Sequence, residues 1–224
     1  MYTVARFCAL ASLLWTLLIP CAVAQDSSSL PKYGSASKSD AQRTADEQFL
    51  AGIDQQYKGD RKKAGQEFAT RGWQSLRQGN PREAMRRFNQ AWLLDSSNGH
   101  ALWGMGAVQG GTGKSDEAIK LFQETEKSLP DDIDFATDYA RTLGMAAAEA
   151  KDDAALQQAF KRYARIQERA PNHTLNLQNW AITLFYVGNY AEAWRKLSLA
   201  EATPRRGEID AGFVEELQKK MPRP

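Results

Sequence analysis

A fixed spacing of small and aromatic residues is the strongest constraint on how this chain can fold. Four residues near its centre each have an identical counterpart thirty-four positions earlier. The pairs are Gly72 and Gly106, Gly79 and Gly113, Ala84 and Ala118, and Phe88 and Phe122. Self-similarity at this period indicates stacked units, each of which buries its apolar face against its neighbours. Within one unit, the small residues let two helices approach closely while the phenylalanine fills the space beneath them.

The central unit, residues 99–132, resembles the tetratricopeptide repeat (TPR). Its landmarks stand at offsets 4, 8, 15, 20, 24 and 32 of the unit, namely Leu102, Gly106, Gly113, Ala118, Phe122 and Pro130. The resemblance implies an all-α solenoid, a right-handed superhelix of antiparallel helix hairpins. Extended along the chain, the register predicts four hairpins within residues 61–206, at about 65–98, 99–132, 133–173 and 174–206.

The third unit departs from the fixed spacing. Ala140 follows Gly106 by thirty-four positions, but Ala159 follows Ala118 by forty-one, so seven residues are inserted between Ala147 and Ala159. Seven residues are close to two helical turns. We therefore expect about one extra turn on each helix of this hairpin, which should protrude from the stack.

A capping helix is predicted at each end of the array, over residues 41–60 and 207–224. Each has an apolar residue at every fourth position: Phe49, Ile53 and Tyr57 in the first, and Ile209, Phe213 and Leu217 in the second. A single amphipathic helix cannot bury its own apolar face, so each is expected to cover the exposed end of the repeats.

Residues 1–24 have the pattern of a secretory signal peptide. Arg6 precedes an apolar stretch that runs to Ile19, and the small-residue site 22–24 follows. This pattern predicts cleavage after Ala24 and export to the periplasm. Residues 25–40 are rich in serine and lack an apolar period, so a flexible spacer is expected between the cleavage site and the folded part.

Two alternatives to a cleaved leader remain open. The stretch could stay as a membrane anchor, although it is short for a span. Cys21 could instead carry a lipid, although Pro20 departs from the small residue that precedes the cysteine in bacterial lipoprotein signals. Cys8 and Cys21 are the two cysteines of the chain. Cleavage after Ala24 would remove both, so the mature chain would have no thiol and no disulfide. The apolar stretch would be removed with them, so no membrane insertion is expected after cleavage.

One segment has the ending of a phosphate-binding loop. Gly113, Lys114 and Ser115 fit its last three positions, but Val108 stands where the first glycine is required. Such a loop also follows a buried strand, whereas this segment follows a predicted helix. We therefore expect Gly113 to be the turn glycine of the repeat and Ser115 to cap the next helix, without nucleotide binding.

Candidates for catalysis or metal binding are scarce. His100 and His173 each stand at the start of a predicted hairpin, without a cysteine, histidine or acid at metal-ligand spacing. No serine stands in a nucleophile-elbow motif. The formal charge is +2, of which Arg6 of the leader supplies one, so no nucleic-acid partner is indicated. We expect no cofactor, no metal and no enzymatic activity. An enzyme or small-ligand binder is the remote alternative.

The TPR resemblance implies that the first helix of each hairpin lines an inner groove, mainly at offsets 2, 5, 9, 12 and 13. On this chain, the offsets include Leu76, Asp134, Thr137 and Ile182, which are not among the main candidates. The candidate partner-binding residues carried over in this way are Trp73, Arg77, His100, Trp103, Arg141, Met145, Gln178, Phe185 and Tyr186. Large aromatics with arginines are typical of peptide recognition. The alternative is that Trp73 and Ile182 pack between hairpins, while Phe185 and Tyr186 contact the final helix.

The sequence therefore predicts a periplasmic adaptor that binds a protein or peptide partner without chemistry of its own. The alternative is an assembly factor of the cell envelope, of secretion or of pili, anchored through Cys21.

Overall fold

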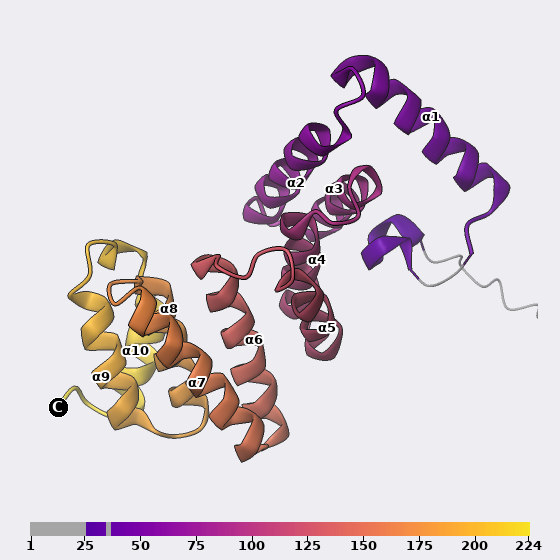
Figure 1. Ribbon diagram of the computed structural model, residues 1–224. Coiled ribbons are helices and arrows are strands. Elements are labelled where there is room, and N and C mark those ends of the chain that lie inside the picture. Colours follow the sequence, from indigo (N-terminus) through magenta and orange to yellow (C-terminus); the bar gives the residue numbers. More distant parts are fainter. Residues whose placement is uncertain (1–25, 35–36) are drawn as a thin grey trace, which may run out of the picture.

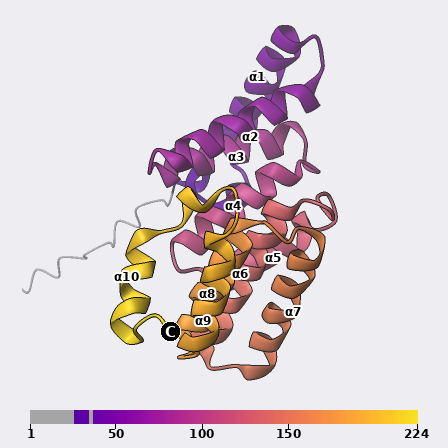
Figure 2. The ribbon, with the colours of Figure 1, turned by 90° about the vertical axis from the view of Figure 1, so that its left-hand side faces the viewer.

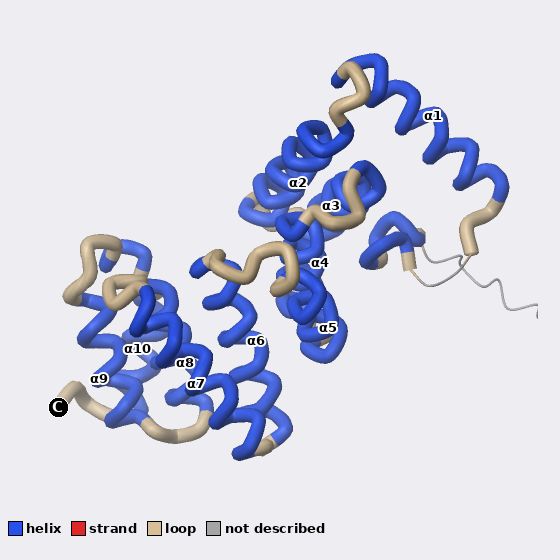
Figure 3. The backbone as a smooth tube through the Cα atoms, viewed as in Figure 1, coloured by secondary structure: helices blue, strands red, loops and turns tan. Residues whose placement is uncertain are grey.

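The computed structural model describes residues 26–34 and 37–224, which form helices and loops without a strand (Figures 1 and 3). The predicted leader, its cleavage site and Cys21 lie outside these residues. Among the helices of the described ranges, none has the length and apolar character needed to cross a membrane.

Eight of the described helices form four consecutive hairpins. The pairs are α2 (Arg61–Arg77) with α3 (Pro81–Leu94), α4 (Gly99–Gly111) with α5 (Ser115–Thr125), α6 (Ile133–Ala150) with α7 (Asp153–Arg169), and α8 (Thr174–Tyr186) with α9 (Tyr190–Glu201). Each hairpin contacts the next, so the pairs form a continuous array (Figure 1). The predicted all-α solenoid is confirmed, and its first hairpin starts slightly earlier than the spacing indicated.

Glycines in the left-handed region close three of the four hairpins. Gly79, Gly113 and Gly188 have φ angles of 73°, 80° and 79°, which glycine adopts without the steric penalty of a Cβ. Gly113 is thus the turn residue that the repeat register predicted. The third hairpin closes instead at Lys151, which has a φ of 55°.

Ser115 does not cap α5, contrary to the prediction. Helix α5 begins one residue earlier than predicted. The carbonyl of Lys114 already accepts the first helical hydrogen bond, from the N–H of Ala118 at 3.0 Å. Ser115 is therefore the first residue of α5, and no side chain caps this helix. Asp116 and Glu117 lie in its first turn, where negative charge is favourable.

Aromatic rings fill the notches left by glycines. A Cβ added at Gly72 would lie 2.5 Å from the ring of Phe88, and one added at Gly104 would lie 2.2 Å from it. At Gly106 the added Cβ would lie 2.3 Å from Phe122. These approaches leave no room for any side chain, so the hairpins pack by a match between glycine and ring, as the sequence spacing predicted for Gly72 and Phe88.

The third hairpin carries the expected extra turns. Helices α6 and α7 have 18 and 17 residues, compared with 13 and 11 in α4 and α5 of the second hairpin. Asp152 caps α7, since its Oδ1 accepts a hydrogen bond from the N–H of Ala155 at 2.9 Å. The seven inserted residues are therefore divided between the two helices.

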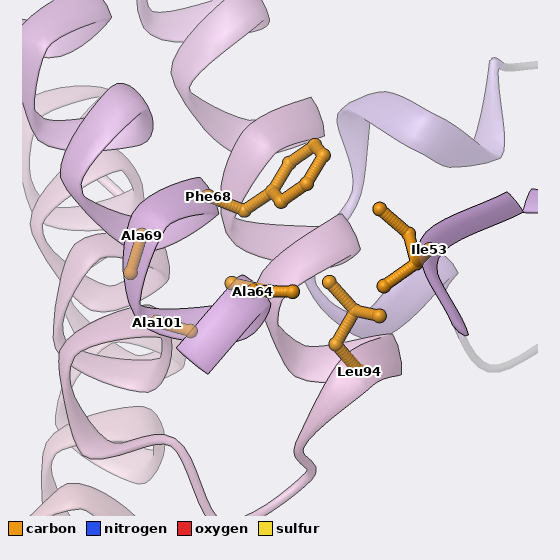
Figure 4. Close-up of a cluster of buried hydrophobic side chains, with 7 residues drawn as sticks. Ile53, Ala64, Phe68, Ala69, Leu94 and Ala101 are labelled. Carbon is orange, nitrogen blue, oxygen red and sulfur yellow. The ribbon is translucent and has the colours of Figure 1, made fainter. Parts of the chain in front are cut away.

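A further helix packs at each end of the array. At the N-terminal end, α1 (Asp40–Tyr57) places Ile53 against a cluster that includes Phe68 and Leu94 (Figure 4). At the other end, α10 (Ala211–Lys220) lies beside α8 and α9 (Figure 2). Its Phe213 and Leu217 are buried there.

Residues 26–34 are not a spacer without contacts. They form two short 3₁₀ turns, η1 (Ser27–Ser29) and η2 (Pro31–Tyr33), which pack against α3. The side chain of Asn89 is fully buried, and its Nδ2 donates hydrogen bonds to the carbonyls of Ser28 at 2.8 Å and Leu30 at 2.7 Å. Arg86 also donates hydrogen bonds to Asp26 Oδ2 at 3.1 Å and to Ser28 Oγ at 3.2 Å. The serine-rich composition carries no sign of this packing, because the buried contact of Asn89 is made to backbone carbonyls of the segment.

Candidate functional site

A groove of about 440 Å³ lies between helices α2, α4 and α6. We call it the inner groove and define it by its lining residues. These are Trp73 and Leu76 from α2, Ala107, Gly110 and Gly111 from α4, Ser115 and Phe122 from α5, and Asp138, Arg141, Thr142 and Met145 from α6. The first helices of three successive hairpins thus contribute most of one continuous surface.

Trp73 forms one wall of the groove, and Trp103 of the next hairpin supports it from behind. The rings of Trp73 and Trp103 meet edge to face with their centroids 4.7 Å apart. Trp73 also packs against Phe88 at 5.4 Å, and Trp103 against Phe135 at 6.0 Å. Because both tryptophans are held by core aromatics, the wall is rigid and presents Trp73 to the groove in a fixed orientation.

A carboxylate is held against this wall. Trp103 Nε1 donates a hydrogen bond to Asp138 Oδ2 at 2.9 Å. Burial raises the pKa of Asp138, and the Trp103 hydrogen bond and the charge of Arg141 offset part of that rise. Asp134 and Asp132 add to it by repulsion. The groove therefore holds a poorly solvated carboxyl group beside an aromatic surface.

Solved structures share this arrangement of helices. TTC0263, a thermophilic TPR protein of Thermus thermophilus, matches with a TM-score of 0.63 at 18% identity, over 71% of this chain and 84% of that chain. The chain has the TPR fold. PilF of Pseudomonas aeruginosa matches with a TM-score of 0.52 at 16% identity, over 73% of each chain. No protein-family model and no curated protein matches the sequence.

Three of the residues predicted for the groove of the TPR array line it in the structure: Trp73, Arg141 and Met145. A fourth, Tyr186, lies in an adjoining hollow of about 310 Å³ that it shares with Met145, Ala148 and Glu149. Tyr186 is 62% exposed, which is unusual for a large aromatic residue. The inner groove therefore continues toward the fourth hairpin through Met145.

Three further predicted residues lie at the edge of the groove or outside it. Trp103 supports Trp73 and Asp138 from behind the wall. His100 is exposed, with its ring centroid 5.9 Å from that of Trp103. Arg77 is exposed at the last turn of α2. Neither His100 nor Arg77 is among the lining residues.

Gln178 and Phe185 were predicted for the groove, and the structure corrects this. Gln178 is buried, and its Oε1 accepts a hydrogen bond from the N–H of Asp210 at 2.6 Å. Phe185 packs against Tyr190 and Phe213, with centroids 5.5 Å and 5.8 Å away. Asp210, which precedes α10, contacts α8 at Gln178, and α10 itself contacts it at Phe185, so both side chains fasten the C-terminal cap instead.

The repeat offsets missed Asp138 and two lining glycines of α4, Gly110 and Gly111, which we call the floor of the groove. Asp138 precedes Arg141 by three residues, and this spacing places both on one face of α6. A sequence signal for Asp138 therefore existed, although it lies outside the family's usual offsets. Gly110 and Gly111 lie between Val108 and Gly113, in the segment compared with a phosphate-binding loop, but at positions which that motif leaves unconstrained.

The histidines and acids elsewhere serve local structure. His173 caps α8, accepting the N–H of Asn176 on Nδ1 at 3.2 Å, and its Nε2 lies 2.9 Å from Asp134. Asp131 pairs with Arg169 at 3.0 Å. In the described ranges, no group of three or more His, Cys, Asp or Glu side chains is placed to hold a metal ion.

Proposed function

We propose that the protein is a non-enzymatic adaptor whose TPR array binds a protein partner, as an extended peptide, through the inner groove. The observation that carries this proposal is the groove itself. Three hairpins line it, a rigid tryptophan forms one wall, and one basic and one acidic side chain stand on α6. Fixed aromatics and an arginine supply contact area and directional hydrogen bonds at little entropic cost, as peptide recognition requires.

The shape and charge of the groove favour a peptide over other ligands. It runs across successive hairpins and continues into the hollow at Tyr186, which suits an elongated ligand. Its charged groups include both Asp138 and Arg141, whereas a nucleic-acid site would be uniformly basic. We propose no nucleotide, metal or other cofactor for this site.

The proposal places the protein in the periplasm, on the strength of residues 1–24. The alternative is a lipid anchor at Cys21, which would suit an envelope or pilus assembly factor. The mass of the mature N-terminus decides between them. A chain beginning at Gln25 supports a free adaptor, and an acylated chain beginning at Cys21 supports the anchored form.

Peptide selection followed by affinity measurement tests the groove. A phage-displayed library of random peptides is selected on the immobilised protein, and fluorescence anisotropy gives the Kd of each binder. The double variant Arg141→Ala/Tyr186→Ala should raise Kd at least about tenfold, since both side chains are exposed where the ligand would lie. The matched control, Arg165→Ala/Leu199→Ala, removes an exposed arginine and an exposed apolar residue from the second helices and should leave Kd unchanged.

Two results would contradict the proposal. A library that yields no binder would remove the support for peptide recognition, and equal Kd values for the parent and the groove variant would move the site elsewhere. A thermal-shift screen with metal ions and nucleotides examines the remote alternative, because a ligand that binds the folded state raises the melting temperature.

A further inference from the structure

Two glycines at the end of α4 have no packing reason to be glycine. A Cβ added at Gly110 would meet its nearest neighbours at 3.7 Å, an ordinary contact, and one added at Gly111 would meet nothing within 4 Å. Neither has a positive φ angle. Glycine inside a helix reduces stability by about 0.5–1 kcal/mol relative to alanine. Gly110 lies just inside the end of α4 and Gly111 is its last residue, so the cost falls mainly on Gly110, and packing gives no reason for glycine at either position.

This floor differs from the other glycine positions of the same helix. At Gly104 and Gly106 an added Cβ would lie within 2.2 Å and 2.3 Å of a phenylalanine ring. Gly110 and Gly111 instead line the inner groove, together with Ala107. Small residues there leave the helix backbone uncovered at the bottom of the groove. The ligand backbone can therefore approach α4 closely.

Above this floor, the Asp138 carboxylate has no cation beside it. Among the described residues, no lysine, arginine or histidine nitrogen lies within 4.0 Å of its oxygens. Arg141 is the nearest compensating charge along α6, and it is exposed. A half-buried carboxylate without a cationic partner gains from a cation that brings both charge and hydrogen bonds.

The wall beside Asp138 also suits a cation. Trp73 lines the groove, and the ring of Trp103 lies against it while donating its N–H to Asp138. Tryptophan is the aromatic side chain that attracts ammonium and guanidinium groups most strongly. The carboxylate of Asp138 and the ring of Trp73 thus favour the same kind of ligand group within one groove.

We propose that the inner groove selects a peptide carrying a lysine or arginine, with its backbone over Gly110 and Gly111 and its basic side chain against Asp138. This rests on the proposed function, since it specifies which peptide the groove takes. Arg141, three residues along α6, then meets an acidic side chain or a carbonyl of the same peptide.

The charge preference is tested with the peptides selected from the random library. Binders of the parent protein should share a lysine or arginine, and changing that residue to glutamine should raise Kd at least about tenfold. Asp138→Asn keeps an acceptor for Trp103 but removes the charge. The affinity of Asp138→Asn for the basic peptide should fall by a similar factor. The glutamine peptide should bind Asp138→Asn and the parent protein equally well, because the two changes remove the same interaction and are coupled.

The floor is tested by a substitution that should not harm the fold. Gly111→Leu should keep or raise the melting temperature, because the position is open and glycine is a poor helix former. It should still raise the Kd of the same peptides at least about tenfold. The matched control is Gly52→Leu in α1, where an added Cβ also meets nothing within 4 Å. It should leave Kd unchanged.

The outcomes separate this inference from the proposed function. If the parent selects no peptide, the proposed function fails. If peptides bind without a shared basic residue and bind Asp138→Asn equally well, the function stands and the cation site is overturned. Enrichment of acidic residues in place of basic ones, with an effect that depends on Arg141, would likewise overturn it. Unchanged binding to Gly111→Leu would show that the ligand backbone does not lie on α4.

Discussion

Helices α4 and α8 hold the same position in their hairpins and have the same length, 13 residues, but different chemistry packs them. Helix α4 contains five glycines, and two of them receive phenylalanine rings. Helix α8 contains none and is held by buried hydrogen bonds. Tyr163 Oη lies 3.0 Å from Thr183 Oγ1, and Asn176 Nδ2 donates a hydrogen bond to the carbonyl of Tyr163 at 3.1 Å. The hydroxyl oxygens of Thr174 and Thr203 lie 2.6 Å apart.

The two helices also differ in what covers their inner faces. The end of α4 is open and forms the floor of the inner groove. Helix α8 is covered by Asp210, which contacts Gln178, and by α10, whose Phe213 contacts Phe185. The same repeat offset can therefore face a ligand in one hairpin and a cap in another, depending on whether the next segment of the chain folds back over it.

The largest effect is expected where a ring fills a glycine notch of α4. Gly106→Leu would place a side chain where even a Cβ lies 2.3 Å from Phe122. Overpacking of this kind reduces stability by about 3 kcal/mol, which corresponds to a fall in Tm of about 6–12 °C for a chain of this size. Gly52→Leu, at an open position, is the control. A thermal melt of Gly106→Leu that matches the parent would contradict the repeat register.

A second, smaller effect should distinguish cap from groove at the end of α8. Phe185→Ala should lower the free energy of unfolding by about 2 kcal/mol, because it removes the ring packed on Phe213. Tyr186→Ala, at the adjacent exposed position, should change it by no more than about 0.5 kcal/mol. Urea unfolding of both variants measures the difference. Equal losses would mean that Tyr186 also supports the cap.

A third effect tests the buried hydrogen bonds of α8 directly. Tyr163→Phe removes the hydroxyl that lies against Thr183 Oγ1 and should reduce stability by about 1 kcal/mol. Burial raises the pKa of the Tyr163 hydroxyl, so it stays protonated throughout the neutral range. Tyr186→Phe, an exposed change of the same kind, is the control. If Tyr163→Phe has no effect in urea unfolding, shape alone would account for the packing of α8.

The fold was predictable because matched volumes recur at a fixed spacing. Gly72 and Gly106 stand opposite Phe88 and Phe122, and one register describes both hairpins. The second contact of Phe88, with Gly104, was not predictable in this way. Its counterpart thirty-four positions earlier is Thr70, so the period carries no signal for it.

The rest of the structure depends on partners that no period relates. Asn89 binds backbone carbonyls of residues 26–34, whose side chains show no pattern. Gln178 binds a backbone N–H of the segment before α10. For the candidate site, the offsets placed Trp73, Arg141 and Met145 on the groove. They missed Asp138, whose setting depends on Trp103 from another hairpin.

The last effect, no larger than that of Tyr163→Phe and confined to alkaline pH, concerns a lysine that packs against α8 from α9. Lys196 is 3% exposed, its Nζ lies 3.2 Å from the centroid of the Trp180 ring, and it donates to Gln167 at 2.9 Å. Burial lowers the pKa of Lys196 to about 8, with Arg195 adding to the effect and Glu192 opposing it. A lysine in an unfolded chain titrates near about 10.4.

Between these two pKa values the unfolded state binds more protons than the folded state, so the free energy of unfolding should rise with pH. Below about pH 8 both states are protonated, and the penalty for burying the charge is fully present. Taken alone, the two pKa values correspond to a gain of about 3 kcal/mol. The attraction between the ammonium and the Trp180 ring favours the charged form and opposes this shift, so we expect the parent to gain only about 1 kcal/mol over Lys196→Met across this window. Urea unfolding of both proteins at a series of pH values measures the difference. The free energy of unfolding could instead depend on pH in the same way for the parent and for Lys196→Met. The Trp180 ring and Gln167 would then compensate the buried charge of Lys196 completely, and polar packing around α8 and α9 would carry no electrostatic penalty.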